Sequence, residues 1–465
     1  MKILMIKARL NRFYGQAVPP LGLLYLSAFL KKHGYRDVTI LHPDVQEPRG
    51  AELEKAVAGS GADIVAISAI TAEGRSMHEL ARLAKRLRPQ ALVVVGGAHP
   101  TGYARDCLKD PAIDIAVRGE GELTLLELVR SREAGRSCDA IHGISYRRGG
   151  EIVSNPAREF IEDLDTLPFP DWDAVSPDAY ARFIPQTPVL FGERYGSVLT
   201  SRGCPYRCVF CHGVMGKKFR PHGPERVIGE LAALSARWSL RHIEVADDIF
   251  NYDRERTLLI LRGLAHADLG LKLHLCGIRM ELLDREMIDL MAQAGVVYAA
   301  TGLESGSRRM QRAIRKNVDL ERFRDLSNHM VKRRIFVTAG FMLGFPGETV
   351  KEIFATLRYA WSLKIHTAML AFYHPYRGTE LGDALPAGQA LGADDDLLPF
   401  YSSVAGIHCS SLSAWKLMLL KWLGNTVFYF NPSRIFRILR DLPNPSPRVI
   451  MLLLGKLAER TLFLR

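Results

Sequence analysis

Short apolar segments rich in Val and Ile alternate with helical segments in two separate stretches of this 465-residue chain. In the first stretch the candidate strands are residues 2–6, 38–42, 63–68, 92–97 and 115–119. Runs of this kind are typical of parallel strands buried on both faces, with helices making the crossover connections. The pattern predicts a doubly wound α/β domain over residues 1–150.

The alternation resumes after residues 151–195, which are rich in Pro and Asp, lack periodicity and are predicted to form a linker. The second set of candidate strands is 197–201, 242–247, 272–277, 296–302, 336–344 and 366–372. Helical segments follow the first five, so six strand–helix units predict a partial (β/α)6 barrel of the TIM type over residues 196–385. Residues 386–465 are apolar with spaced Lys and Arg, and they are predicted to form a C-terminal helical region.

The composition limits the setting and the partners of the chain. The N-terminal sequence MKILMIKARL predicts a strand rather than a signal peptide, and seven cysteines, an odd number, suit free or metal-bound thiols. A reducing, cytoplasmic setting is therefore expected. The net charge of +12 fits a solvated basic surface, an anionic substrate, nucleic acid or a membrane face. No stripe of Lys and Arg suited to phosphate contacts is visible, so no specific nucleic acid partner is expected.

Three of the seven cysteines lie in the stretch SRGCPYRCVFCHG, as Cys204, Cys208 and Cys211 in a C-x₃-C-x₂-C array. The array follows the first strand of the predicted barrel, and active sites of such barrels lie at the C-terminal ends of the strands. Structural zinc sites normally use four protein ligands, and no second cysteine pair is present, although His222 could serve as a fourth ligand. An iron–sulfur cubane held by three thiolates keeps one iron open for a substrate or cofactor. The array therefore favours a catalytic iron–sulfur cluster over a structural zinc ion.

With the aromatic Phe210 directly before the last cysteine, this array resembles that of the radical S-adenosylmethionine (SAM) enzymes. The resemblance implies a 4Fe–4S cluster bound by Cys204, Cys208 and Cys211, with SAM chelating the open iron. Reductive cleavage of SAM would give methionine and a 5′-deoxyadenosyl radical that abstracts hydrogen from an unactivated C–H bond. Phe210 would flank the adenine of SAM.

Other residues at the ends of the predicted barrel strands match segments in which this family contacts SAM. The sequence TGLESGS ends the fourth strand, GFMLGFPGET the fifth and HPYRGTEL the sixth. The predicted SAM contacts are Phe210, Glu304, Ser305, Gly344, Pro346 and Tyr376. Each of these segments also has a structural explanation, because Gly and Pro form turns and single acids cap helices. Cys276 is expected to be a buried strand residue rather than a fourth ligand.

The first domain resembles the flavodoxin-like cobalamin-binding domain of the cobalamin-dependent radical SAM enzymes. The segments PPLGLLYL, VAISAIT, VVVGGAHPT and VRGEGE carry this resemblance. The cobalamin contacts that it implies are Ser68, Thr71, Gly96, Gly97, His99, Gly119 and Glu120. Many cobalamin proteins ligate cobalt with the His of a D-x-H-x-x-G loop, but residues 7–32 contain no His, so cobalt would lack a protein His ligand. The alternative is a domain that binds substrate or serves packing alone.

The resemblance implies methyl transfer from methylcobalamin to an unactivated carbon of a small-molecule substrate. A reductant such as flavodoxin or ferredoxin would supply the electron. The alternatives, in order, are a ring-forming or oxidative cyclase without net methylation, a tRNA methylthiotransferase, and a zinc-stabilised nucleic-acid-binding protein. The methylthiotransferase would need additional N-terminal cysteines, and only Cys107 and Cys138 precede the linker. The sequence identifies no general base.

The C-terminal region combines aromatic with basic residues, which suits either of two environments. These residues are Trp415, Lys416, Lys421, Trp422, Phe428, Phe430, Arg434, Arg437 and Arg440. Amphipathic helices packed on the barrel are the expected arrangement. The alternative is peripheral contact with a membrane, which would suit a hydrophobic substrate such as a lipid, a terpenoid or a tetrapyrrole.

Overall fold

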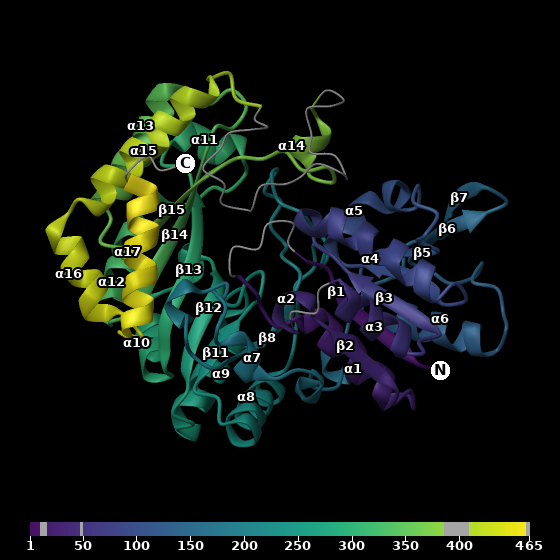
Figure 1. The fold of residues 1–465 in the computed structure, drawn as a ribbon. Coiled ribbons are helices and arrows are strands. Elements are labelled where there is room, and N and C mark those ends of the chain that lie inside the picture. The colour runs from purple at the N-terminus through teal and green to yellow at the C-terminus, as the bar shows by residue number, and fades with distance from the viewer. Residues whose placement is uncertain (10–15, 47–49, 386–408, 462–465) are drawn as a thin grey trace. The chain divides into compact units, whose positions relative to one another are not determined.

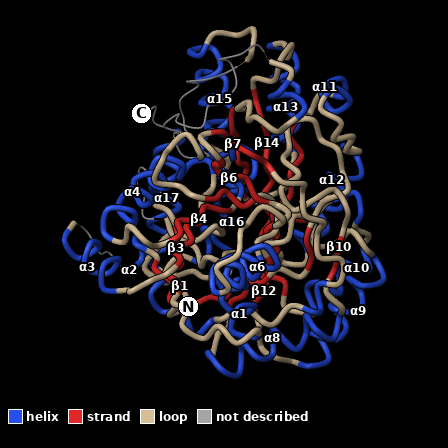
Figure 2. Tube along the Cα trace, turned by 90° about the vertical axis from the view of Figure 1, so that its right-hand side faces the viewer, coloured by secondary structure: helices blue, strands red, loops and turns tan. Residues whose placement is uncertain are grey.

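A computed structural model describes residues 1–9, 16–46, 50–385 and 409–461 of the chain, which divides into two compact units (Figure 1). The first unit begins at Met1 and ends at Tyr180, and the second begins at Ala181. The division falls within residues 151–195, the stretch predicted to be a linker. Figure 2 shows the strands of both units lying between helices, as expected for α/β layers.

The first unit contains a seven-stranded sheet in the order β2-β1-β3-β4-β5-β6-β7. Its strands are β1 (Ile3–Lys7), β2 (Val38–Leu41), β3 (Ile64–Ser68), β4 (Leu92–Gly96), β5 (Ile115–Val117), β6 (Ile144–Arg148) and β7 (Glu151–Ser154). The first five strands are parallel, and the chain reverses direction across the sheet between β1 and β3. This order confirms the doubly wound, flavodoxin-like prediction. The antiparallel hairpin β6–β7, which turns at Gly149 and Gly150, was not predicted.

Helices cover both faces of this sheet. They are α1 (Leu21–Lys32), α2 (Pro43–Gln46), α3 (Ala51–Gly59), α4 (Gly74–Leu87), α5 (Ala98–Cys107) and α6 (Glu122–Glu133), with the short 3₁₀ helix η1 (Thr71–Glu73) before α4. Alternate strand residues, among them Ile6, Ile67 and Val95, form one core with α3, α4 and α5. α1 and α6 contact each other elsewhere in the unit. The segment after β7 contains the short helices η2 (Leu164–Thr166), η3 (Trp172–Ala174) and α7 (Pro177–Tyr180).

The second unit contains a six-stranded parallel sheet in which each strand pairs with the next one along the chain. Its strands are β8 (Tyr195–Val198), β11 (His242–Val245), β12 (Lys272–Ile278), β13 (Val296–Glu304), β14 (Phe336–Leu343) and β15 (Thr367–Phe372). The order confirms the predicted partial (β/α)6 barrel. A short antiparallel pair, β9 (Ser201–Arg202) and β10 (Arg220–Pro221), flanks the cysteine array.

The helices of the barrel are α8 (Pro224–Trp238), α9 (Arg254–Ala267), α10 (Arg285–Gln293), α11 (Arg308–Ala313), α12 (Leu320–Lys332), α13 (Val350–Ser362) and α14 (Glu380–Asp383), with η5 (Met280–Leu282) after β12. Side chains that accept hydrogen bonds from backbone amides begin six of them, α9 to α14: Asp253, Asp284, Ser307, Asp319, Thr349 and Thr379. Such caps satisfy amides that have no partner within the helix, so these residues fix where each helix starts.

Three further helices, α15 (Ala414–Tyr429), α16 (Pro432–Asp441) and α17 (Pro447–Thr461), pack on the barrel. α15 contacts α13 and β15, where Trp361 Nε1 donates to the carbonyl oxygen of Gly424 at 3.0 Å. Val189 of η4 (Pro188–Leu190) packs with Val449 of α17. These helices confirm the helical prediction for residues 409–461, while residues 386–408 lie outside the described residues.

Packing on the barrel places two of the residues named for membrane contact in the interior. Phe428 and Arg434 are each 1% exposed. The guanidinium of Arg434 lies 3.6 Å from the centroid of the Phe428 ring, a cation–π contact that shields both side chains from solvent. The lipid assignment is therefore wrong for these two residues. No helix in the described part of the chain is long and apolar enough to cross a bilayer.

Candidate functional site

The cysteine array forms a loop between β9 and β10 in the second unit. Gly203 opens the loop with a φ of 83°, and a side chain there would lie 2.9 Å from the carbonyl oxygen of Met215. Desolvation raises the pKa of the Cys211 thiol to about 11, and the thiolates of Cys208 and Cys204 act in the same direction. Burial likewise raises the pKa of Cys204, with Cys208 contributing. Cys204 and Cys208 thus lie close enough to Cys211 to disfavour ionisation of its thiol, which a cationic centre at the array would reverse.

The donor set fits an iron–sulfur cluster. Within the described ranges, no three His, Cys, Asp or Glu side chains converge closely enough to hold one metal ion. A cubane differs from a single ion because it takes one thiolate at each of several separate irons. Cys276 lies apart from the array in β12, where its sulfur is 3.3 Å from the hydroxyl oxygen of Thr187.

The loop is held by the segments that follow β13 and β15. The amide of Val209 donates to the carbonyl oxygen of Ile314 at 3.3 Å, and the amide of Leu381 donates to that of Val209 at 2.9 Å. Val209 also joins a buried apolar cluster with Met310, Ile314, Phe345 and Tyr373. The cysteine loop is therefore fixed by backbone hydrogen bonds on one side and by apolar packing on the other.

Two of the predicted SAM-contacting segments meet at this loop. The ring of Phe210 lies 5.7 Å from that of Phe345, so Phe210 adjoins the segment containing Gly344 and Pro346. Tyr376, from the segment after β15, lies 5.7 Å between ring centroids from His212. Phe210 thus adjoins the segment that contains Gly344 and Pro346, and Tyr376 adjoins His212, which directly follows Cys211.

A buried acid that was not predicted shapes the segment after β14. Gly344 and Gly347 have φ values of 86° and 68°, which favour glycine. The carboxylate of Glu348 accepts hydrogen bonds from the amides of Gly344 at 2.7 Å and Phe345 at 3.2 Å. Burial raises the pKa of Glu348 to about 7 despite these bonds. Glu348 therefore holds the turn that contains Gly344 and Phe345.

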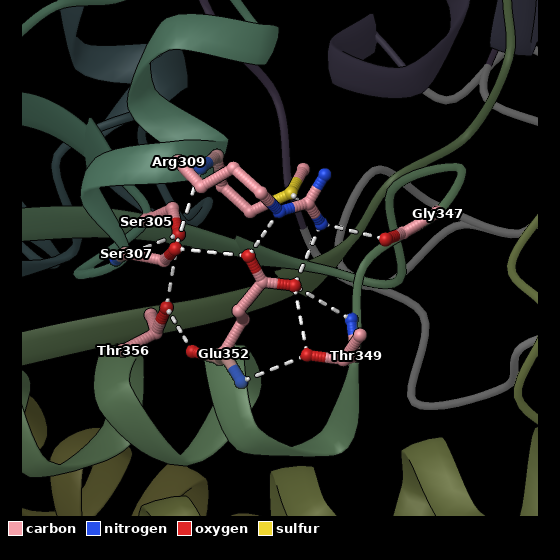
Figure 3. Close-up of polar contacts among 8 residues, drawn as sticks. Ser305, Ser307, Arg309, Gly347, Thr349, Glu352 and Thr356 are labelled. Atoms are coloured by element: carbon pink, nitrogen blue, oxygen red, sulfur yellow. Dashed lines mark hydrogen bonds and ion pairs between the residues drawn. The ribbon is translucent and has the colours of Figure 1, made fainter.

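Glu304 and Ser305 end β13 in different orientations. Glu304 has a φ of 69° and forms an ion pair of 3.3 Å with Lys316. Ser305 is fully buried, and its hydroxyl lies 3.1 Å from that of Thr356 and accepts a hydrogen bond from the amide of Ser307 (Figure 3). The carboxylate of Glu304 thus lies beside the ammonium group of Lys316, whereas the hydroxyl of Ser305 is hydrogen-bonded within the barrel.

Arg309 links the segments that follow β13 and β14 (Figure 3). Its guanidinium donates to the two carboxylate oxygens of Glu352 at 2.5 and 2.7 Å and to the carbonyl oxygen of Gly347 at 2.7 Å. Thr349 forms a capping box with Glu352 at the start of α13. This bidentate pair therefore fixes the glycine turn relative to the start of α11.

The pair makes a pH-dependent contribution to stability. The hydrogen bond from Arg309 lowers the pKa of Glu352 from 4.5 to about 2. A carboxyl whose pKa is lower in the folded state stabilises it above the unfolded pKa, and this contribution is lost as pH falls towards the folded pKa. We expect the stability difference between wild type and Glu352→Gln, measured by urea unfolding, to shrink as pH falls from 4.5 to about 2. A difference that stays constant across this range would contradict the assignment.

A buried cation adjoins the array from β12. Arg279 is 7% exposed, its guanidinium lies 3.5 Å from the centroid of the Tyr206 ring, and it donates to the carbonyl oxygen of Lys316 at 3.0 Å. It also forms an ion pair with Glu281. Arg279 therefore connects the cysteine loop to the Glu304–Lys316 pair. Sequence reasoning did not assign Tyr206 or Lys316 to the site, because neither belongs to a spaced motif.

In the first unit, the predicted cobalamin residues lie where the parallel strands end. Ser68 ends β3 and Gly96 ends β4. Gly97 has a φ of 101°, and a Cβ there would lie 2.7 Å from the carbonyl oxygen of Ala69. Thr71 follows in η1. The turn after β4 therefore needs glycine, because its backbone packs directly against the turn that follows β3.

The remaining predicted cobalamin residues are directed into the unit. His99 is fully buried and stacks on Tyr103 with ring centroids 5.0 Å apart. Glu120 is 9% exposed and accepts a hydrogen bond from the amide of Ile161 at 2.8 Å. The amide of Gly119 donates to the hydroxyl of Thr101 at 3.1 Å. In this conformation the side chains of His99 and Glu120 support the loops that carry them.

An ion pair that sequence reasoning missed lies at the same edge of the sheet. Lys7 ends β1 and pairs with Glu73 of η1. Burial raises the pKa of Glu73 even though Lys7 opposes the shift. The only sequence signal is that Lys7 ends the apolar strand β1 and Glu73 lies in the connection after the apolar strand β3. The pair adds a fixed dipole to the edge that carries Ser68 and Gly97.

Two families of protein domain match the chain, in the order that the sequence predicts. The B12 binding domain matches residues 10–129. The radical SAM superfamily matches residues 198–360. The two matches therefore cover the sheet edge with Ser68 and Gly97 and the part of the barrel from the end of β8 into α13, with its cysteine array.

Three relatives align with much of the chain. The uncharacterized methyltransferase PH0819 of Pyrococcus horikoshii is 32% identical over 84% of this chain and 84% of its own length. Cytidylyl-2-hydroxyethylphosphonate methyltransferase of Streptomyces wedmorensis is 29% identical over 78% of this chain and 77% of its own length. The anaerobic magnesium-protoporphyrin IX monomethyl ester cyclase of Rubrivivax gelatinosus is 28% identical over 78% of this chain and 65% of its own length.

A solved structure shares the fold. The radical SAM methyltransferase TsrM of Kitasatospora setae, with cobalamin and a [4Fe-4S] cluster bound, matches with a TM-score of 0.70 and 20% identity over 82% of this chain and 74% of that chain. The two domain matches and the relative at 32% identity go further, because they identify the family. This chain belongs to the cobalamin-binding radical SAM enzymes, whose cofactors are a 4Fe–4S cluster, S-adenosylmethionine and cobalamin.

Proposed function

We propose that this enzyme transfers a methyl group to an unactivated carbon of a small organic substrate. When bound, the cluster and SAM supply a 5′-deoxyadenosyl radical, and cobalamin supplies the methyl group. The observation that carries the proposal is the alignment of 84% of the chain with a relative named as a methyltransferase, in a fold with two strand-end sites. The B12 binding domain match favours it over the tRNA methylthiotransferase and zinc-protein alternatives.

The residues of the barrel would divide the binding of the cluster and SAM. Cys204, Cys208 and Cys211 would hold the cluster. The ring of Phe210 and the backbone of residues 344–346 would flank the adenine, since these groups adjoin the array. Glu304, fixed beside Lys316, is suited to a hydroxyl or an amino group of SAM, whereas Ser305 would position the segment through Thr356.

The first unit would bind cobalamin at its sheet edge. The strained turn at Gly97 and the ends of β3 and β4, at Ser68 and Gly96, would contact the cofactor, with Thr71 beside them. His99, Gly119 and Glu120 would shape the loops rather than ligate cobalt. The expected partners are a hydrophobic substrate and a low-potential reductant such as flavodoxin or ferredoxin, in a cytoplasmic setting.

Product stoichiometry tests the proposal. The protein is reconstituted anaerobically with iron, sulfide and cobalamin, then supplied with SAM carrying a trideuterated methyl group and a panel of lipid, terpenoid and tetrapyrrole substrates. Methyl transfer predicts equal amounts of S-adenosylhomocysteine, 5′-deoxyadenosine and a product carrying the trideuterated methyl group. Omitting cobalamin should abolish that product. A turned-over substrate without the label would contradict the proposal.

A cyclase is the second candidate, because the relative from Rubrivivax gelatinosus carries that name. A ring-forming reaction would consume SAM to give 5′-deoxyadenosine and a product of lower hydrogen content, without stoichiometric S-adenosylhomocysteine. The same mass spectrum therefore distinguishes the two reactions. A tetrapyrrole substrate in the panel tests the cyclase directly.

A further inference from the structure

The helix α16 presents an apolar face to solvent. Ile435, Phe436 and Leu439, spaced as neighbours on one side of a helix, are 41%, 67% and 52% exposed. Phe430, at the end of α15, is 75% exposed. These four residues, here called the α16 face, lie on α16 and at its junction with α15, among the helices packed on the barrel (Figure 1). A cluster of large exposed side chains on one helix usually marks a contact surface.

The opposite side of α16 is polar and buried, which reverses the usual arrangement of a surface helix. Arg434 donates to the carbonyl oxygens of Ile365 and Leu363 at 2.5 and 2.9 Å. Asp441, with no exposed side-chain surface, pairs with Arg334 at 2.8 Å. Polar contacts and the packing of Ile438 therefore anchor α16 to the barrel, while Ile435, Phe436 and Leu439 are left outside.

The charged residues of the C-terminal helices are mostly basic. Residues 409–455 contain six basic residues and a single acidic residue, Asp441, which is buried in ion pairs. Lys416, Arg440 and Arg448 are exposed. A second copy of this chain on the same face would bring like charges together. An anionic lipid bilayer has a negatively charged surface and an apolar interior. It therefore complements both the positive charge of the Lys and Arg side chains and the exposed apolar side chains.

We propose that the α16 face docks this enzyme on anionic phospholipid membranes. Phe430, Ile435, Phe436 and Leu439 enter the boundary between headgroups and acyl chains, and the nearby Lys and Arg side chains contact lipid phosphates. Membrane docking by this face does not depend on which reaction the barrel catalyses, so it goes beyond the proposed function. Its consequence is delivery of the barrel to substrates that partition into membranes.

Vesicle co-sedimentation of the full chain tests the proposal. The probes are vesicles of phosphatidylcholine alone and of phosphatidylcholine with phosphatidylglycerol. Wild type is expected to bind the anionic vesicles, and binding should weaken as salt rises because the charges are screened. The double variant Phe436→Ser with Leu439→Ser should lower the fraction bound by about tenfold or more. A matched control is Leu259→Ser on α9, where the leucine is 49% exposed and binding should stay at the wild-type level.

Circular dichroism and the midpoint of urea unfolding must match wild type in both variants, since the substituted side chains are exposed. Equal sedimentation of wild type and the double variant would overturn the proposal. Loss of a concentration-dependent dimer in that variant, without loss of vesicle binding, would also overturn it by showing that a second copy covers the face. The rate of 5′-deoxyadenosine formation without vesicles should be unchanged, which separates this result from the proposed function.

Discussion

Replacement of Cys208 by alanine is expected to reduce 5′-deoxyadenosine formation by more than about 1,000-fold, equivalent to about 4 kcal/mol of barrier. The loop places three thiols within electrostatic reach of one another, and each is predicted to bind a different iron of the cluster. Loss of one thiolate leaves an iron without a protein ligand. Cys204→Ala and Cys211→Ala should behave alike, because the three positions are equivalent as donors.

The measurement is chromatography of SAM products from anaerobically reconstituted protein, with iron content and visible absorption recorded for each variant. Cys138→Ala supplies the matched control, since Cys138 belongs to the first unit and the array to the second, and it should leave activity and iron content at wild-type values. If Cys208→Ala formed 5′-deoxyadenosine at the wild-type rate, the assignment of the cluster to the cysteine array would be wrong.

Substitution of Asp441 by alanine is expected to lower the free energy of unfolding by about 1–3 kcal/mol, since it leaves the buried His366 without its acceptor. Its carboxylate has no exposed surface and accepts ion pairs from Arg334 at 2.8 Å, Arg440 at 2.6 Å and His366 at 3.1 Å. Burial acts to raise the pKa of Asp441, but the hydrogen bonds from His366 and the two arginines outweigh it and lower the pKa. Removing the carboxylate leaves a buried His366 and two cations without their shared partner.

Urea unfolding followed by tryptophan fluorescence and by circular dichroism measures this loss. Asp441→Asn keeps the shape of the side chain and one acceptor oxygen, so it should lose less stability than alanine. The difference in free energy of unfolding between wild type and Asp441→Ala should also fall in acid. A carboxyl group whose pKa is lowered in the folded state stabilises that state at neutral pH, and this effect is lost when the group is protonated. An alanine variant as stable as wild type would show that His366, Arg334 and Arg440 find other partners.

The parallel strands of both units were predictable because each is a short apolar run between helix signals. The hairpin β6–β7 was not, because Arg147 and Arg148 interrupt its apolar residues and its turn, Gly149–Gly150, resembles a loop. Tertiary contacts stabilise it: the guanidinium of Arg147 donates to the carbonyl oxygens of Asp110 and Ile113. Period and composition cannot reveal a strand whose partners lie far away in sequence.

For the candidate site, the segments that carry its residues were predictable, but the orientations of the side chains were not. The spacing of Cys204, Cys208 and Cys211 by itself indicates a thiolate site for a metal cluster, and glycine turns indicate where the backbone can approach a ligand. Ser305 shares a segment with Glu304, yet its hydroxyl bonds Thr356, which only the packing of α13 decides. The pairs Lys7–Glu73 and Arg279–Tyr206 join residues distant in sequence, so only the folded topology reveals them.

The packing of Val189 against Val449 has a consequence for synthesis of the chain. Each barrel strand pairs with the next, so the sheet can grow as the chain leaves the ribosome. The apolar cluster that Val189 forms with Tyr298 and Phe336 is completed only when α17 arrives. At about 5–20 residues per second this cluster stays uncovered for on the order of ten seconds or more. Nascent chains are therefore most exposed to misassembly at this end of the barrel, where a molecular chaperone would act.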